Sequence, residues 1–119
     1  MALRDFKDLI VWQKAMDLLV EVYKLTATYP AEEKFGLAAH TRKTVVSIPS
    51  NVAEGYSRQH RPEYVRHVDI AYASAAELET QLLAADRLGF LQPDQRHVFE
   101  LHREVERMLA ALRHSLRHA

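Results

Sequence analysis

Apolar residues recur at the spacing of an α-helix along almost the whole chain, with polar residues between them. The first helix is expected from about Asp8 to Thr28. It carries two neighbouring apolar stripes, which together are wider than the core of a helical bundle requires. One stripe consists of Val11, Ala15, Leu18, Val22 and Leu25, and the other of Trp12, Met16, Leu19 and Tyr23. Two interpretations follow: this helix is deeply buried, or part of the arc contacts another subunit, with Trp12 as the candidate interface residue.

A second helix is expected to begin at Glu33 or Phe35 and to end at Tyr56. Pro49 falls inside it, where a proline removes one backbone donor and clashes with the carbonyl four residues earlier, so we expect a kink there. Small residues surround this proline and would let a neighbouring backbone come close. These are Ser47, Ser50, Ala53 and Gly55, and the inward positions of the helix are Leu37, Val45, Ile48 and Val52.

Two further helices follow, each opened by a proline. The third is expected from Pro62 to Leu88, with Gly89 just after its end, and the fourth begins after Pro93. The inward face of the third is Tyr64, Val68, Ala71, Ala75, Leu78, Leu82 and Ala85, and that of the fourth is Val98, Leu101, Val105, Met108, Leu112 and Leu116. No segment alternates like a strand, and the joints are short. We therefore predict an all-α fold, an antiparallel up-down-up-down four-helix bundle formed by one domain, 1–119.

Composition narrows the classes of function. The chain has 119 residues and no cysteine, which excludes a disulfide scaffold, a thiolate metal site and a cysteine nucleophile. Lysine and arginine together number 16, as do aspartate and glutamate, so the total charge does not point to nucleic acid. The first residues mix both charge signs and no long apolar span exists, so we expect a cytoplasmic location and no membrane contact.

Several short motifs carry a family resemblance. Val46 to Gly55 reads V-S-I-P-S-N-V-A-E-G, and a proline inside a helix beside such small residues is unusual. Phe35-Gly36-Leu37 and Arg42-Lys43 precede this stretch, and the chain opens with Phe6 to Leu9 and V-W-Q-K-A. Later in the chain stand E-L-E-T-Q-L, from Glu77, and Leu88-Gly89. To about Phe90 the sequence resembles the four-helix bundle family named after 23S rRNA intervening sequences, and it is similar to the accessory proteins of diversity-generating retroelements.

The resemblance implies a bundle that assembles into a ring, most simply a homopentamer, and a role in nucleic-acid binding. The retroelement accessory proteins bind nucleic acid and a reverse transcriptase. The sequence departs from the family pattern at His40, where Gln is usual, and at Thr41, where a larger apolar residue is usual. The positions that match the family's structural motif are Arg42, Ile48, Pro49, Ser50, Asn51, Glu54, Gly55, Glu77 and Glu79.

Catalytic and metal chemistry find little support in the sequence. A di-iron bundle needs Glu-x-x-His on two helices, and no Glu is followed by His three residues later. His114 and His118 are four residues apart and could share one metal ion, but histidine in a last helical turn also complements the helix dipole. Glycine-rich phosphate loops and a Gly-x-Ser-x-Gly motif are absent. We expect a protein that is not an enzyme and uses no cofactor.

Three charged residues are expected near the seams between helices. Arg42, Glu77 and Glu79 could form a ligand site, or an ion pair that fixes the packing of two helices. We predict the second, with Arg42 paired to a carboxylate of the third helix.

The topology supplies the argument for a nucleic-acid site. In an up-down bundle the N-terminus, the second joint and the C-terminus share one end, which would gather Arg4, Lys7 and five further arginines against Asp5, Asp8, Glu54 and Glu63. A ring would repeat that basic end and add avidity for phosphates. The predicted contacts are Arg58, Arg61, Arg66, Arg113 and Arg117, with Tyr56 as a stacking ring, and RNA as the first candidate ligand.

A second class of function remains open at this point. Arginine and histidine near helix C-termini also complement the dipole, which explains basic residues without any ligand. On that view the broad apolar arc of the first helix builds a homo-oligomeric scaffold that docks a protein partner, such as a reverse transcriptase.

Overall fold

Four long helices make up the fold. The structure, a computed structural model, describes residues 5–118. The helices are α1 (Ile10–Thr26), α2 (Leu37–Ser57), α3 (Arg61–Arg87) and α4 (His97–Arg117), and short 3₁₀ turns precede three of them: η1 (Phe6–Asp8), η2 (Ala31–Glu33) and η3 (Pro93–Gln95). No strand occurs within the described part of the chain. The prediction of an all-α fold with four helices is confirmed.

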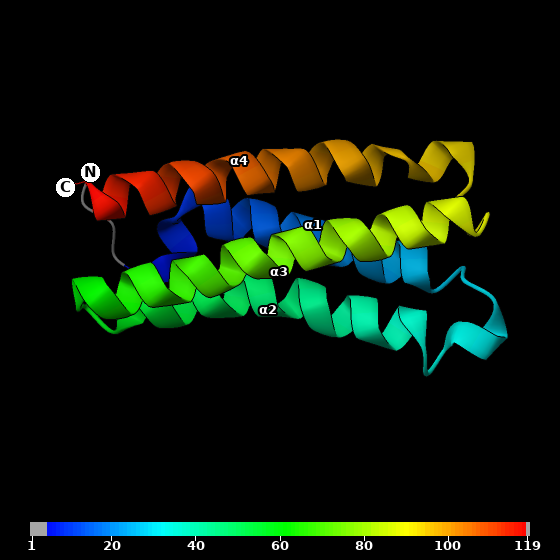
Figure 1. Ribbon diagram of the computed structural model, residues 1–119, viewed down its shortest axis with the longest axis horizontal. Helices are drawn as coiled ribbons and strands as arrows, with labels where there is room; N and C mark the ends of the chain where they lie inside the picture. The colour runs from blue at the N-terminus through cyan, green and yellow to red at the C-terminus, as the bar shows by residue number, and fades with distance from the viewer. Residues whose placement is uncertain (1–4, 119) are drawn as a thin grey trace.

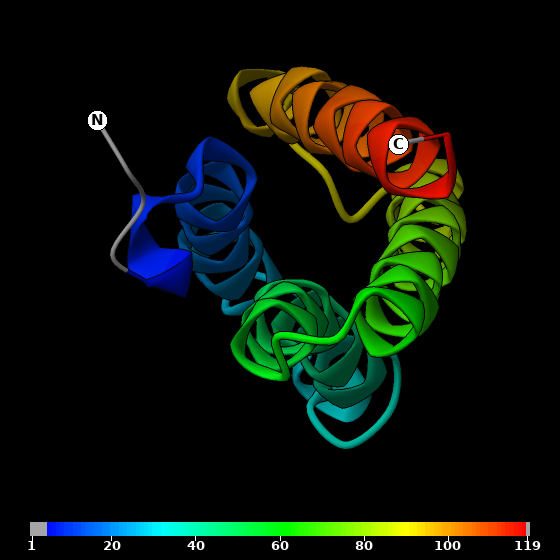
Figure 2. The same ribbon diagram turned by 90° about the vertical axis from the view of Figure 1, so that its left-hand side faces the viewer.

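The helices lie side by side along one long axis. In Figure 1 the chain follows α1 towards one end, returns along α2, runs out again along α3 and returns along α4. Each helix packs against the one before it, and α4 also packs against α1. Figure 2, which looks along the bundle, places α1 and α3 at opposite corners. The packing is that of a helical bundle, with extents of 44 × 24 × 23 Å.

The core follows the expected apolar faces of three helices. All five residues of the first α1 stripe are buried, whereas the second stripe is half-buried or exposed. The predicted face of α3 is buried from Val68 to Ala85, and only Tyr64 is half-buried. On α2 the buried set is larger than expected, because Thr41 and Thr44 are buried as well as Val45, Ile48 and Val52. Their hydroxyls donate to backbone carbonyls one turn earlier, which satisfies them inside the core.

The inward face of α4 differs from the prediction. The buried residues are Val98, His102, Val105 and Leu109, while Leu101, Met108 and Leu112 flank them half-buried. His102 is only 1% exposed, and its Nε2 lies 2.7 Å from the carbonyl oxygen of Ala75 on α3. A histidine occupies the centre of this face. A prediction made from apolar residues alone therefore places the buried face too far around the helix, towards Leu101.

Proline and glycine mark the joints as expected. Gly89 has φ of +80° and follows α3, where the amides of Gly89 and Phe90 donate to the carbonyls of Asp86 and Ala85. This pattern is a Schellman motif, which terminates the helix with a left-handed residue. Pro49 lies inside α2, whose helix continues on both sides of it. The kink expected at Pro49 stays a prediction.

Candidate nucleic-acid interface

The predicted contact arginines come from two separate parts of the chain. Arg58 and Arg61 flank the joint between α2 and α3, Arg66 lies on the second turn of α3, and Arg113 and Arg117 lie on the last turns of α4. Figures 1 and 2 show that the α2–α3 joint and the end of α4 are at the same end of the bundle. Arg4, the other arginine predicted there, lies outside the described residues.

Arg58, Arg113 and Arg117 form ion pairs within the chain. Arg58 Nη2 lies 2.8 Å from Glu54 Oε2, and this hydrogen bond is the main reason why the pKa of Glu54 is lowered. Arg113 Nε lies 2.7 Å from Asp69 Oδ1, and Arg117 Nη2 lies 2.6 Å from Asp69 Oδ2. Asp69 was missed in the sequence, and it makes this end less positive than the count of arginines indicates.

Asp69 joins α3 to the last turns of α4. Partial burial raises the pKa of its carboxyl, but the hydrogen bonds from Arg113 and Arg117 outweigh burial, so the pKa is lowered. The guanidinium carbon of Arg113 also lies 4.9 Å from the centre of the Tyr72 ring. No sequence signal identifies Asp69, because it is separated from its partners by more than forty residues.

The remaining predicted contacts differ in their exposure. Arg61 and Arg66 are exposed, and Arg66 forms no ion pair with any described residue. Tyr56 is half-buried, with its ring edge-on to that of Tyr64 at 5.9 Å between centres. Burial raises the pKa of Tyr64 to about 12. Arg66 therefore lies exposed and outside any ion pair with a described residue, whereas Tyr56 would need to leave part of its contact with Tyr64 to stack on a base.

The motif in α2 forms a polar chain against α3. Ser47 Oγ lies 2.9 Å from Ser74 Oγ, and the Asn51 amide donates to the Ser47 carbonyl at 2.8 Å. Because the side-chain nitrogen of Asn51 is the donor in this bond, its side-chain oxygen accepts a hydrogen bond from Nδ1 of His67 at 3.0 Å. His67 is 5% exposed, and its Nε2 has no hydrogen-bond partner among the described residues; the nearest carboxylate oxygen, on Glu54, is 3.7 Å away.

Gly55 lies where α2 and α3 are too close for a side chain. A Cβ atom on Gly55 would lie 2.7 Å from the Cβ of His67 and 3.2 Å from a ring carbon of Tyr64. Ile48 and Pro49 are buried, whereas Ser50 is exposed. The motif therefore holds α2 and α3 close together. Hydrogen bonds join the two helices, and the absence of a side chain at Gly55 lets them approach each other.

The predicted pairing of Arg42 with a carboxylate of α3 is wrong. Arg42 faces α1 instead, where Nε donates to Thr26 Oγ1 at 2.8 Å and Nη2 donates to the Tyr23 carbonyl at 3.1 Å. Carbonyl groups in the last turn of a helix carry partial negative charge and attract a guanidinium, and the Tyr23 carbonyl accepts from Arg42 as well as from the Ala27 amide. Oε1 of Glu77 lies 3.3 Å from the Thr44 hydroxyl oxygen, and Glu79 is half-buried on α3.

Trp12 is half-buried, and a residue of the same chain covers part of it. The ring of Phe6, in η1, packs edge-on against the Trp12 ring at 5.3 Å between centres. The proposed role of Trp12 in a subunit contact stays a prediction.

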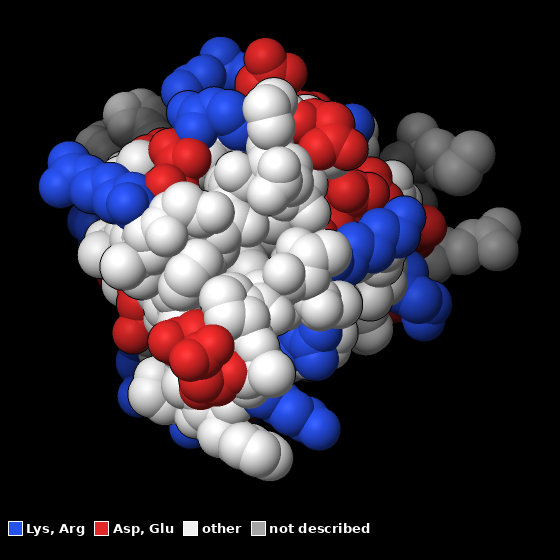
Figure 3. Space-filling model, turned by 90° about the vertical axis from the view of Figure 1, so that its right-hand side faces the viewer, with Lys and Arg blue, Asp and Glu red and all other residues white. Residues whose placement is uncertain are grey.

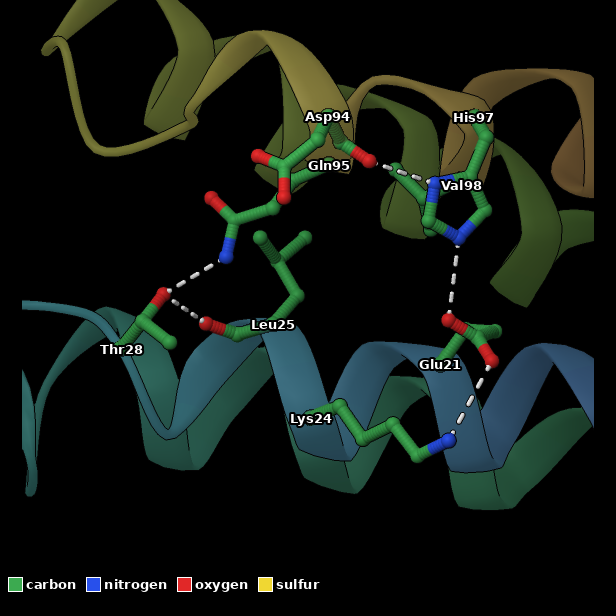
Figure 4. Close-up of a pocket in the computed structure, with 8 residues that line it drawn as sticks. All are labelled: Glu21, Lys24, Leu25, Thr28, Asp94, Gln95, His97 and Val98. Atoms are coloured by element: carbon green, nitrogen blue, oxygen red, sulfur yellow. Dashed lines mark hydrogen bonds and ion pairs between the residues drawn. The ribbon is translucent and has the colours of Figure 1, made fainter.

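A polar cluster also closes the seam between α1 and α4. Figure 4 shows His97 between two acceptors: Nδ1 lies 2.9 Å from the Asp94 carbonyl and Nε2 lies 3.0 Å from Glu21 Oε2. Because both partners only accept, the two hydrogen bonds can form together only with the imidazolium. The hydrogen bond to Glu21 is the main cause that raises the pKa of His97, and the same bond is the main cause that lowers the pKa of Glu21.

This cluster gives a stability prediction with a defined sign. The raised pKa of His97 adds stability that is complete below its ordinary pKa of 6.5 and is lost as the pH rises through the folded-state value. The lowered pKa of Glu21 adds stability that is complete above 4.5 and is lost in acid. His97 is 56% exposed, so water screens the pair to a few tenths of a kcal/mol. Thermal melts should place His97→Gln about 1–2 °C below the wild type at pH 6 and level with it at pH 8.5; equal differences at both pH values would contradict the imidazolium.

Neither a metal-binding cluster nor a membrane-spanning helix is found in the described part of the chain. Residues 5–118 contain no group of three histidine, cysteine, aspartate or glutamate side chains placed to hold a metal ion. None of the described helices combines the length and the apolar character that a bilayer crossing requires. His114 and His118 stack at 4.1 Å between ring centres on the exposed last turn of α4.

The sequence was compared with known proteins. No curated protein matches it. The family model described as 23S rRNA-intervening sequence protein matches residues 7–111, which include all of the α2 motif and most of each helix. The chain belongs to the 23S rRNA-intervening sequence protein family.

Proposed function

We propose that this protein is a non-enzymatic, ring-forming homo-oligomer, most simply a homopentamer, that binds RNA through the end formed by the α2–α3 joint and the last turns of α4. The observation that carries the proposal is the meeting of arginines from these two distant segments at one end. The family description, with its link to 23S rRNA, makes RNA the first ligand to test.

The ion pairs at this end are compatible with phosphate binding. In the Arg58–Glu54 pair the side chains are 50% and 51% exposed, and Arg117 is 45% exposed beside Asp69. Exposed pairs of this kind contribute little to stability because water screens them, so a phosphate can replace the carboxylate. Arg66 needs no such exchange.

The exposed apolar residues support a ring. On α1, Ile10 is 62%, Val20 46% and Tyr23 39% exposed; on α3, Ile70 is 40% and Leu83 44% exposed. Because α1 and α3 occupy opposite corners of the bundle, their outer faces point away from each other. A head-to-tail ring requires two different faces of this kind on each subunit.

RNA binding can be tested with a matched pair of charge reversals. Arg66→Glu and Arg87→Glu change two exposed arginines on the same helix, but at opposite ends of it. Fluorescence anisotropy of a labelled structured RNA should show binding that Arg66→Glu weakens severalfold at low salt. The salt slope should fall by about 0.7–0.9 for each phosphate that the variant no longer binds.

The control decides whether the binding belongs to this end. Arg87→Glu should bind RNA nearly as the wild type does, and circular dichroism should show that all variants remain helical. An equal loss in Arg87→Glu would place the effect in the total charge and overturn the proposed interface. A wild type that leaves RNA unbound at tens of micromolar would favour a scaffold that docks a protein partner.

The ring predicts a concentration-independent oligomer in solution. Light scattering after size exclusion should give a mass several times the 13.7 kDa of the chain. Val20→Glu and Leu83→Glu place a charge on either proposed face and should each release monomers, whereas Glu106→Gln on α4 should not. A monomeric wild type at micromolar concentration would contradict the ring and leave single-subunit RNA binding to be judged by anisotropy alone.

A further inference from the structure

A hollow of about 330 Å³ opens where α1 ends and α2 begins, at the end of the bundle opposite the proposed RNA interface. Figure 3 looks at this end, where uncharged residues cover much of the surface and charged side chains lie between and around them. The hollow is lined by Thr26, Ala27, Tyr29, Pro30, Ala31, Lys34, Ala38 and Arg42. Two of these residues are cationic, and none is acidic.

This charge distinguishes the hollow from two others in the structure. The hollow at the α1–α4 seam includes Glu21 and Asp94, and the hollow along α2 and α3 includes Glu77. In both, a carboxylate offsets the nearby lysine. Of these three hollows, the one beside Arg42 has cations and no carboxylate in its wall, which favours an anion in a chain without net charge.

Arg42 is held in place before any ligand arrives. Its Nε and Nη2 donate to Thr26 and to the Tyr23 carbonyl, and its guanidinium carbon lies 4.6 Å from the centre of the Tyr23 ring. These contacts use one N–H of Nε and one of Nη2, while Nη1 forms no hydrogen bond with a described residue. A guanidinium already fixed by its neighbours loses little entropy when it binds a carboxylate.

Two further side chains complete the wall. Lys34 is exposed and forms no ion pair with a described residue; its Nζ lies 5.6 Å from the centre of the Phe35 ring. Tyr29 is 7% exposed, and its hydroxyl has no hydrogen-bond partner among the described residues. Burial raises the pKa of Tyr29 to about 12, and the hydroxyl oxygen is itself closed off from solvent, so Tyr29 lines the hollow without offering a donor to a ligand.

We infer that this hollow binds a small carboxylate with a compact apolar body, held by the guanidinium of Arg42 and the ammonium of Lys34. Planar carboxylates fit the guanidinium fork, and the alanine and proline side chains of the wall suit an apolar body rather than a bare ion. The volume lies at the lower end of the range for small-molecule sites. The site is independent of RNA binding at the other end.

Benzoate is a suitable probe, with benzamide as its uncharged match and inorganic phosphate as an anion without an apolar body. Calorimetry and amide chemical shifts should show benzoate binding at least tenfold tighter than either, a difference of about 1.4 kcal/mol. The shifted amides should be those of Ala27, Ala31 and Ala38. Equal binding of benzamide would overturn the role of the cations, and tighter binding of phosphate would overturn the role of the apolar wall.

Variants separate binding from folding. Lys34→Gln changes an exposed side chain and should weaken benzoate binding about threefold; Arg42→Gln should weaken it tenfold or more. Arg42 also caps α1, so Arg42→Lys, which keeps the charge but loses the fork, serves if the first variant melts early. Lys43→Gln, one residue along α2 and in a different hollow, is the matched control and should bind as the wild type. Unchanged affinity in both Lys34→Gln and Arg42→Lys would reject the site.

Discussion

Replacing Gly55 with alanine should lower the free energy of unfolding by about 1–3 kcal/mol. The added Cβ would lie 2.7 Å from the Cβ of His67, a distance that packed carbon atoms do not reach. The Cβ of His67 is fixed to the backbone of α3, so the helices themselves must separate to relieve the contact. Separation would also stretch the hydrogen bond between Asn51 and His67 in the same seam.

Whether Gly55→Ala raises or lowers the free energy of unfolding distinguishes between two physical effects. Gly55 lies inside α2, and at an open helical position alanine is better than glycine by about 1 kcal/mol. Helix propensity alone therefore predicts a stabilised protein, and close packing predicts a destabilised one. Urea denaturation followed by circular dichroism distinguishes the two. A variant more stable than the wild type would show that α2 and α3 are not held as close as the structure places them.

The helices and their joints were predictable because their signals are local. Pro62 in the first turn of α3 and Gly89 after its end act through backbone geometry that depends on the residue itself. Helix α3 buries only one of its faces, from Val68 to Ala85. Its apolar residues therefore recur with the 3.6-residue period of a helix, which can be recognised in the sequence. The inward face of α4 was misplaced because His102 is polar by type but buried by virtue of one hydrogen bond to α3.

The candidate site was less predictable because its contacts join distant segments. Sequence placed Arg113 and Arg117 at the correct end of the bundle, but it could not reveal that both would share Asp69. Arg42 was assigned to α3, yet its guanidinium donates to Thr26 and to the Tyr23 carbonyl at the end of α1. In each case the sequence indicated which residue would form a contact but not which residue it would contact. The partner depends on how the helices are turned relative to one another.

Replacing Asn51 with leucine should destabilise the protein by about 2–3 kcal/mol. The change removes the acceptor of Nδ1 in His67, whose other ring nitrogen already lacks a hydrogen-bond partner among the described residues. A 5% exposed imidazole would then be buried with neither nitrogen satisfied. Ser50→Ala, one residue away and exposed, is the matched control and should leave the melting temperature nearly unchanged.

The pair Asn51 and His67 allows a stricter test through a double-mutant cycle. His67→Leu alone leaves the oxygen of Asn51 unpaired and should also destabilise, but the double variant removes both polar groups from the seam together. Its loss of stability should fall short of the sum of the two single losses by about 1–3 kcal/mol. Additive losses would mean that the two side chains do not depend on each other. The polar residues of the family motif would then need an explanation outside the packing of α2 on α3, most directly a ligand.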